Sequence, residues 1–151
     1  MISYEDISHI GLEVTDIDQA ERFYTEALGL RLIHKDEGEL GRGRLILQNG
    51  SGQLLFLEAV AELSARSRFC GPDENNVPDP GTGTRYKGGH LAISVQSSEE
   101  YDEIYPKLEQ YGCYLEGDIR AGRRAAGEKS VYFYDPSGNR LQLIILAPAG
   151  G

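Results

Sequence analysis

Two short segments of the chain alternate between apolar and other residues, and they begin 81 residues apart. The first covers residues 9–14 (HIGLEV) and the second covers residues 90–95 (HLAISV). Alternation with a period of two predicts a β-strand whose two faces differ in character. In both segments the leading histidine falls on the face opposite the regular apolar residues. We therefore expect two related strands, each with a histidine on the face that a packed helix would leave open.

A segment with helical features follows each predicted strand. Asp18 followed by Glu21, and Ser97 followed by Glu100, have the spacing of a capping box, in which side-chain oxygens satisfy the free N–H groups at a helix start. Apolar residues then recur at helical spacing. Pro106 lies inside the second segment and predicts a kink or a weaker helix there. A glycine near the end of each segment predicts its end: Gly29 and Gly112.

Three strand-like runs follow each predicted helix. They cover residues 30–35, 44–48 and 53–58 in the first half, and 114–118, 130–134 and 140–146 in the second. Turns rich in glycine separate the runs. The segment DPSGN at 135–139 has proline second and glycine fourth, as in a type I turn that closes a hairpin.

The chain therefore reads as two copies of a βαβββ unit within one domain, residues 1–151. Repeat 1 covers about residues 5–59 and repeat 2 covers about residues 88–147. A connector rich in proline and glycine, at about residues 60–87, joins them. In a small domain, a connector longer than ~15 residues is usually a functional lid or a tether.

Composition restricts the class of protein. A chain of 151 residues, 40% hydrophobic and 26% charged, predicts one soluble globular domain without a membrane span. Its 24 acidic and 15 basic residues give a net charge of −9, which repels phosphate backbones. We thus expect a small-molecule substrate and no nucleic acid. Cys70 and Cys113 form no metal or redox motif, and the N-terminus lacks the pattern of a signal peptide, so we expect idle thiols and a cytoplasmic protein.

The duplicated unit resembles a known family. Two βαβββ units that each open with a histidine, together with YTEALGL at 24–30 and YDPSGNRLQL at 134–143, resemble the vicinal oxygen chelate superfamily. This group includes glyoxalase I, methylmalonyl-CoA epimerase, extradiol dioxygenases, fosfomycin-modifying enzymes and bleomycin-binding proteins. The resemblance covers nearly the whole chain. It implies an α+β fold, in which two tandem βαβββ modules form a curved, incomplete eight-stranded barrel around a metal cleft, and it implies a homodimer.

The resemblance also implies a set of metal ligands. The family's four cleft-facing positions fall on one residue of the first and one of the last strand of each repeat: His9, Glu58, His90 and Gln142. The spacings of 49 and 52 residues within the two pairs suggest equivalent places in the repeats. Two imidazoles, a carboxylate and an amide oxygen suit a divalent ion such as Zn, Ni, Co, Mn or Fe(II). The third histidine, His34, is not assigned to the site.

Gln142 departs from the family pattern, because many active members have a glutamate there. A glutamine can ligate a metal ion but cannot accept a proton. Glu58, in the mirror position, is therefore the candidate base, and Glu13 is a candidate second acid or base. A basic group interrupts the acidic sequence and offers guanidinium groups for a substrate carboxylate or phosphate: Arg120, Arg123 and Arg124, with Lys129 nearby.

Three functions stay open. The first is a metal-dependent isomerase, epimerase or glyoxalase-type lyase that moves a proton beside a carbonyl of a small oxygen-chelating substrate, such as a hydroxy-ketone, a cyclitol ketone or an acyl thioester. The second is an extradiol-type Fe(II) dioxygenase. Gln142 disfavours it, because the resemblance implies that the family's dioxygenases have a carboxylate at that position. The third is a non-enzymatic drug-binding resistance protein, which the ligand set and the absence of tryptophan disfavour.

Overall fold

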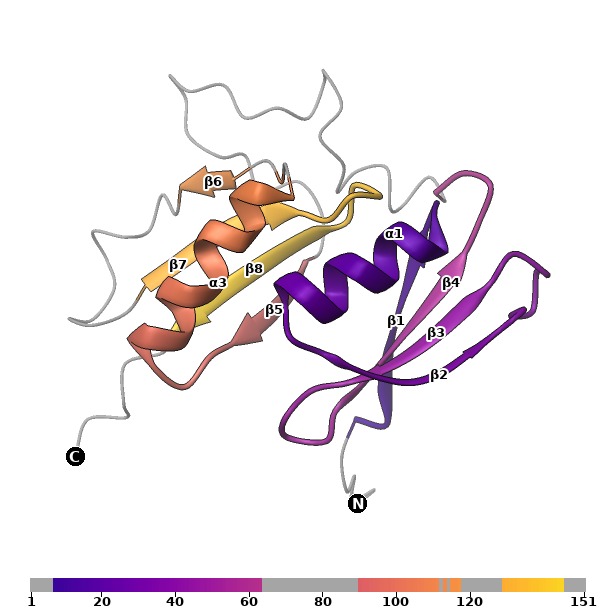
Figure 1. Ribbon diagram of the computed structural model, residues 1–151, viewed down its shortest axis with the longest axis horizontal. Coiled ribbons are helices and arrows are strands. Elements are labelled where there is room, and N and C mark those ends of the chain that lie inside the picture. Colours follow the sequence, from indigo (N-terminus) through magenta and orange to yellow (C-terminus); the bar gives the residue numbers. More distant parts are fainter. Residues whose placement is uncertain (1–6, 64–89, 112, 114, 118–128, 146–151) are drawn as a thin grey trace, which may run out of the picture. The chain divides into compact units, whose positions relative to one another are not determined.

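The structure is a computed structural model that describes residues 7–63, 90–111, 113, 115–117 and 129–145. The chain forms two compact units, residues 1–64 and residues 65–151, called here the first and the second unit. Most of the expected connector lies outside the described residues. Figure 1 shows the helices and strands of both units.

The first unit contains one four-stranded sheet and one helical segment. Its elements are β1 (His9–Val14), α1 (Ile17–Arg22), a π-helical turn η1 (Phe23–Ala27), β2 (Arg31–Asp36), β3 (Arg44–Gln48) and β4 (Leu54–Ala59). The strand order is β1-β4-β3-β2, with β1 parallel to β4 and the other neighbours antiparallel. The helical segment lies across one face of this sheet, where α1 contacts β3 and β4 (Figure 1).

Alternation along the strands separates a buried face from an open face in the first unit. Leu45, Leu47 and Leu57 are fully buried, because their side chains point to the face that the helix covers. The residues between them point to the opposite face and are only partly buried, as the alternating pattern of β3 and β4 shows. His9 and Glu58 lie on this open face, as the sequence predicts for His9.

The start of the first helix differs from the sequence prediction. The N-cap is Asp16, whose carboxylate accepts the Gln19 backbone N–H at 2.9 Å. Asp18 lies in the first turn, where its carboxylate pairs with Lys35 at 2.7 Å. The capping box predicted at Asp18 is therefore wrong by two residues. The predicted end is confirmed, since Gly29 follows the helical segment with a positive φ of 69°.

The second unit repeats this architecture. Its elements are β5 (Leu91–Ser94), α3 (Ser98–Gln110), β6 (Leu115–Gly117), β7 (Lys129–Tyr134) and β8 (Arg140–Ile145). The strand order β5-β8-β7-β6 matches that of the first unit, and α3 contacts β8 (Figure 1). The predicted α+β fold of two βαβββ modules is confirmed, as two open four-stranded sheets. Within the described residues, no helix is long and apolar enough to cross a membrane.

The second helix and the last hairpin agree with the sequence. Ser97 is the N-cap of α3, and its hydroxyl accepts the Glu100 backbone N–H at 3.2 Å. The helix continues through Pro106 to Gln110. In the β7–β8 turn the Gly138 N–H donates to the Asp135 carbonyl at 2.9 Å, which closes the predicted turn and fixes the register of the two strands.

Ser97→Ala should destabilise the protein, because it leaves the Glu100 N–H without its side-chain acceptor. Loss of an N-cap typically lowers the free energy of unfolding by about 1 kcal/mol. Ser98→Ala is the matched control, since Ser98 is the first helical residue and is exposed. The free energy of unfolding of both variants is measured by urea denaturation. An equal loss in the two variants would contradict the prediction.

Candidate functional site

His90 and Gln142 contact each other in the second unit. Gln142 is on β8 opposite Ala92, two residues beyond His90, and its side chain is only 5% exposed. His90 Nε2 and Gln142 Oε1 are 3.0 Å apart. The other end of the amide donates from Nε2 to the Ser130 hydroxyl on β7 at 2.7 Å. Ser130 therefore orients the amide so that its oxygen faces the histidine.

A buried tyrosine and a buried arginine flank this pair. The ring of Tyr132, directly opposite Gln142 in the sheet, meets the His90 ring edge-on with 5.1 Å between centroids. The Arg140 guanidinium lies 4.1 Å from the centre of the Tyr132 ring. Both side chains are buried. The His90 ring thus lies against a tyrosine that itself carries a buried cation–π contact.

His9 has a different neighbour in the first unit. Its ring stacks on Phe56, with 4.3 Å between centroids, and its Nδ1 lies 3.0 Å from the Ser8 hydroxyl. Phe56 is on β4 opposite Gly11, two residues beyond His9. The sheet register therefore makes Phe56, and not Glu58, the counterpart of Gln142. The family resemblance implies Glu58 at this place and the spacing from His9 agrees with it, but the register places Glu58 two residues further along β4.

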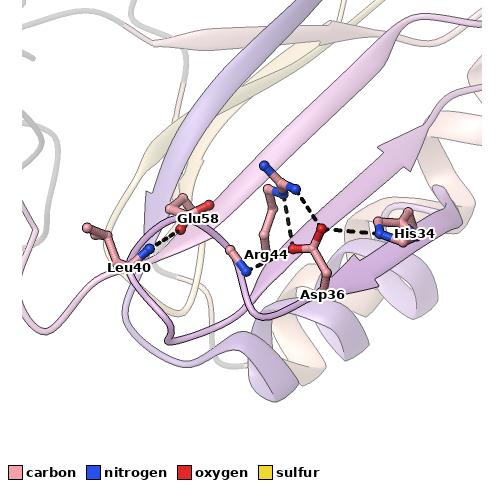
Figure 2. Close-up of polar contacts among 6 residues, drawn as sticks. His34, Asp36, Leu40, Arg44 and Glu58 are labelled. Carbon is pink, nitrogen blue, oxygen red and sulfur yellow. Dashed lines mark hydrogen bonds and ion pairs between the residues drawn. The ribbon is translucent and has the colours of Figure 1, made fainter.

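Glu58 lies two residues beyond Phe56 on β4, which is about 7 Å further along the strand. Its neighbours across the sheet are Glu13 on β1 and Arg44 on β3. The Glu58 carboxylate accepts the Leu40 backbone N–H at 3.2 Å, from the loop between β2 and β3 (Figure 2). Glu13 and Glu58 are thus brought side by side on the open face, at the far end of β1 from His9.

Asp36 at the end of β2 accepts several hydrogen bonds. Arg44 donates to its carboxylate from Nε at 3.1 Å and from Nη2 at 2.5 Å, and the Gly38 N–H donates at 2.8 Å. His34 Nε2 lies 3.2 Å from the same carboxylate (Figure 2). Arg44, with the Gly38 amide, holds the pKa of the Asp36 carboxyl below its usual value. Asp36 therefore stays charged at neutral pH.

His90 and Gln142 are hydrogen-bonded, and the separation of their two atoms is also compatible with a divalent metal ion. Two ligand atoms bonded at about 2.1 Å and at right angles are about 3 Å apart, close to the 3.0 Å of this hydrogen bond. The hydrogen bond from Gln142 to Ser130 is the kind of outer contact that orients a metal ligand. Among the described residues, no group of three or more His, Cys, Asp or Glu side chains could hold a metal ion.

The predicted basic group is described only in part. The structure does not describe its three arginines, Arg120, Arg123 and Arg124. Lys129 pairs with Asp102 of α3 at 2.9 Å, so it ties the helix to β7. Burial, with a smaller contribution from Asp135, raises the pKa of the Cys113 thiol to about 12. Cys113 is therefore protonated and a poor nucleophile at neutral pH, as expected for an idle thiol.

Several residues of the site were not expected from the sequence. Ser130 and Arg140 could have been found from the DPSGN turn, because a hairpin turn fixes which residues of its two strands face each other. Asp36 and Phe56 carry no motif, and their contacts depend on a register between strands that the sequence alone does not reveal.

Comparisons with known proteins agree with this architecture. The family model described as the Glyoxalase/Bleomycin resistance protein/Dioxygenase superfamily matches residues 6–143. A curated relative, 2-epi-5-epi-valiolone epimerase from Actinomyces sp, is 28% identical over 164 residues, covering 95% of this chain and 80% of the relative.

Solved structures share the fold. Lactoylglutathione lyase from Agrobacterium tumefaciens is 25% identical with a TM-score of 0.59, over 94% of each chain. The fosfomycin resistance protein FosX from Listeria monocytogenes, solved with Mn(II) and sulfate, is 20% identical with a TM-score of 0.67, over 96% of this chain and 93% of that one. With the duplicated βαβββ unit and a family match over most of its length, the chain belongs to the glyoxalase/bleomycin resistance protein/dioxygenase superfamily.

Proposed function

We propose that this protein is a divalent-metal-dependent enzyme that moves a proton at a carbon beside a carbonyl group, as an epimerase, an isomerase or a glyoxalase-type lyase. The observation that carries this proposal is the hydrogen bond between His90 Nε2 and Gln142 Oε1 at 3.0 Å, a separation that is also compatible with two ligands of one ion. The substrate is a small molecule with two neighbouring oxygens. A relative named for the epimerisation of a ketone favours a hydroxylated cyclic ketone among the substrates considered.

His90 and Gln142 are two proposed metal ligands. His9, with which the first repeat opens, is a third on the strength of the family resemblance. A divalent ion bound there would polarise the substrate carbonyl and make the neighbouring C–H group more acidic. Ser130 would keep the Gln142 oxygen turned toward His90.

Glu58 is the proposed base. The register supports a role beside the ligands and not among them, since Phe56 stacks on His9 in the position that corresponds to Gln142. Glu58 would take the proton from the carbon next to the carbonyl onto a carboxylate oxygen. Glu13, its neighbour on β1, remains the proposed second acid or base.

The function is tested by hydrogen exchange in deuterated water. The purified protein, loaded with Mn(II), Zn(II) or Co(II), is incubated with cyclic and linear hydroxy-ketones with and without oxygen. We expect deuterium to enter beside the carbonyl without oxygen uptake, and a chelator to stop the exchange. Oxygen consumption with ring opening would instead identify a dioxygenase. Failure to bind any of the three metals would exclude a metal-dependent reaction.

A further inference from the structure

The loop between β2 and β3, residues 37–43, lies against the Glu58 carboxylate. Leu40 of this loop donates its backbone N–H to Glu58 Oε1 at 3.2 Å. Gly38 approaches so closely that an added Cβ atom would lie 2.4 Å from Glu58 Oε1 and 2.9 Å from the carboxylate carbon. Gly38 also has a positive φ of 67°, which side chains other than glycine rarely adopt. The backbone conformation therefore favours glycine at residue 38, and a side chain there would push the Glu58 carboxylate from its present position.

Both ends of the loop are fixed. At the start, the Asp36 carboxylate accepts the Gly38 N–H at 2.8 Å. At the end, the Gly43 N–H donates to the Glu37 carbonyl at 2.9 Å, and the Gly43 carbonyl accepts the Ala59 N–H at 2.8 Å. Ala59 directly follows Glu58, so these bonds connect the loop to the strand that carries the carboxylate. The Asp36 side chain thus fixes Gly38, the residue at which an added Cβ atom would meet the Glu58 carboxylate.

Arg44 stands between two carboxylates. In the sheet it is opposite Asp36 on β2 and opposite Glu58 on β4. Its guanidinium donates from Nε and Nη2 to Asp36 (Figure 2). Within the described part of the chain, the hydrogen bond that Glu58 accepts comes from the neutral Leu40 amide. The two bonds hold the guanidinium on Asp36, although its charge also interacts with that of Glu58.

We propose that Asp36 is a positioning residue for Glu58, which holds the 37–43 loop against the Glu58 carboxylate and keeps Arg44 from pairing with it. Asp36 touches no reacting atom in this role and acts through Gly38, Leu40 and Arg44. The catalytic part of this assignment rests on the proposed role of Glu58 as the base, whereas the structural part does not.

Two variants separate the two effects of Asp36. Asp36→Asn keeps an oxygen that can accept the Gly38 N–H but removes the charge that attracts Arg44. Asp36→Ala removes both. Asp18→Asn is the matched control, because it also neutralises an exposed aspartate of the first unit that pairs with a cation, Lys35, and it does not touch the loop.

The catalytic readout is the steady-state rate of proton exchange. We expect Asp36→Asn to lower kcat about tenfold with little change in KM, because Arg44 then pairs with the base and misplaces it. Adding Arg44→Gln to Asp36→Asn should restore kcat to within about threefold of the parent, since no competing cation remains. A double variant no faster than the single one would overturn the role of Arg44, and a single variant as fast as Asp18→Asn would overturn the role of Asp36.

The structural readout is the exchange of the Leu40 amide proton, measured by NMR on the metal-free protein. In Asp36→Ala we expect this proton to exchange about ten times faster than in the parent, as the loop leaves Glu58. Unchanged Leu40 exchange would overturn the anchoring role, whatever the activity. If Glu58→Gln left catalysis intact, the assignment of Glu58 as the base would be wrong. The Leu40 exchange in Asp36→Ala would still decide whether Asp36 anchors the loop.

Discussion

Glu58→Gln should reduce proton exchange between substrate and deuterated water by a factor of about 10² to 10⁴, the range that general base catalysis usually contributes. The amide keeps the shape of the side chain and can still accept the Leu40 N–H at its oxygen. It cannot accept a proton, so the loss falls on kcat and leaves the fold intact. Metal affinity should stay within about threefold of the parent, because Phe56 and not Glu58 stands in the ligand register.

Glu39→Gln is the control for this variant. Glu39 lies in the same loop region, is exposed, and undergoes the same chemical change. The rate of exchange and the metal affinity of both variants are measured together. Retained exchange in Glu58→Gln would remove Glu58 as the base, whereas a parallel loss of metal binding would place Glu58 among the ligands after all.

Much of the fold could be predicted because local patterns determine it. The alternation in residues 9–14 and 90–95 identifies the first strand of each repeat, and the DPSGN turn determines the last hairpin. The helix starts were harder. In the second repeat Ser97 is the candidate N-cap, with Glu100 three residues later. In the first repeat two aspartates, Asp16 and Asp18, compete for that position. The capping-box pattern selected Asp18, but its carboxylate pairs with Lys35 from β2, a contact between elements that local sequence does not contain.

The candidate site was harder to predict than the fold, because it depends on register. The spacings of 49 and 52 residues from the two histidines are similar, but spacing alone does not tell which residues of two paired strands lie opposite each other. In the structure, the residue opposite the second position after the histidine is Phe56 in one repeat and Gln142 in the other. The aromatic ring at Phe56 stacks on His9 and gives no donor atom, so the two repeats carry different chemistry on the same scaffold. The second repeat carries the hydrogen-bonded pair that we propose as metal ligands, and the first carries the neighbouring carboxylates Glu13 and Glu58.

The loop around Glu58 shows a further limit of prediction from sequence. The three glycines in residues 38–43 predict a turn, but they do not reveal that Gly38 lies against the carboxylate of Glu58, twenty residues later. Such a contact follows only once β3 and β4 are aligned so that Arg44 faces Glu58.

His90→Ala should lower the affinity for divalent metal more than about 100-fold, since even outer contacts of metal ligands contribute 10–100-fold. The variant removes the imidazole from the pair and leaves the Gln142 oxygen as the remaining donor of that pair. Ser130→Ala should weaken binding less, by about tenfold, because it frees the amide to rotate while keeping both donors.

His34→Ala is the matched control, as His34 is exposed and its ring contacts Asp36. Calorimetric titration with Zn(II) and Mn(II) gives the three affinities, and equal affinities for the His90 and His34 variants would show that the metal, if bound, is held elsewhere. We expect the affinity to be lowest in His90→Ala, intermediate in Ser130→Ala and unchanged in His34→Ala only if His90 and Gln142 hold the ion, because the three side chains differ in their contact with Gln142.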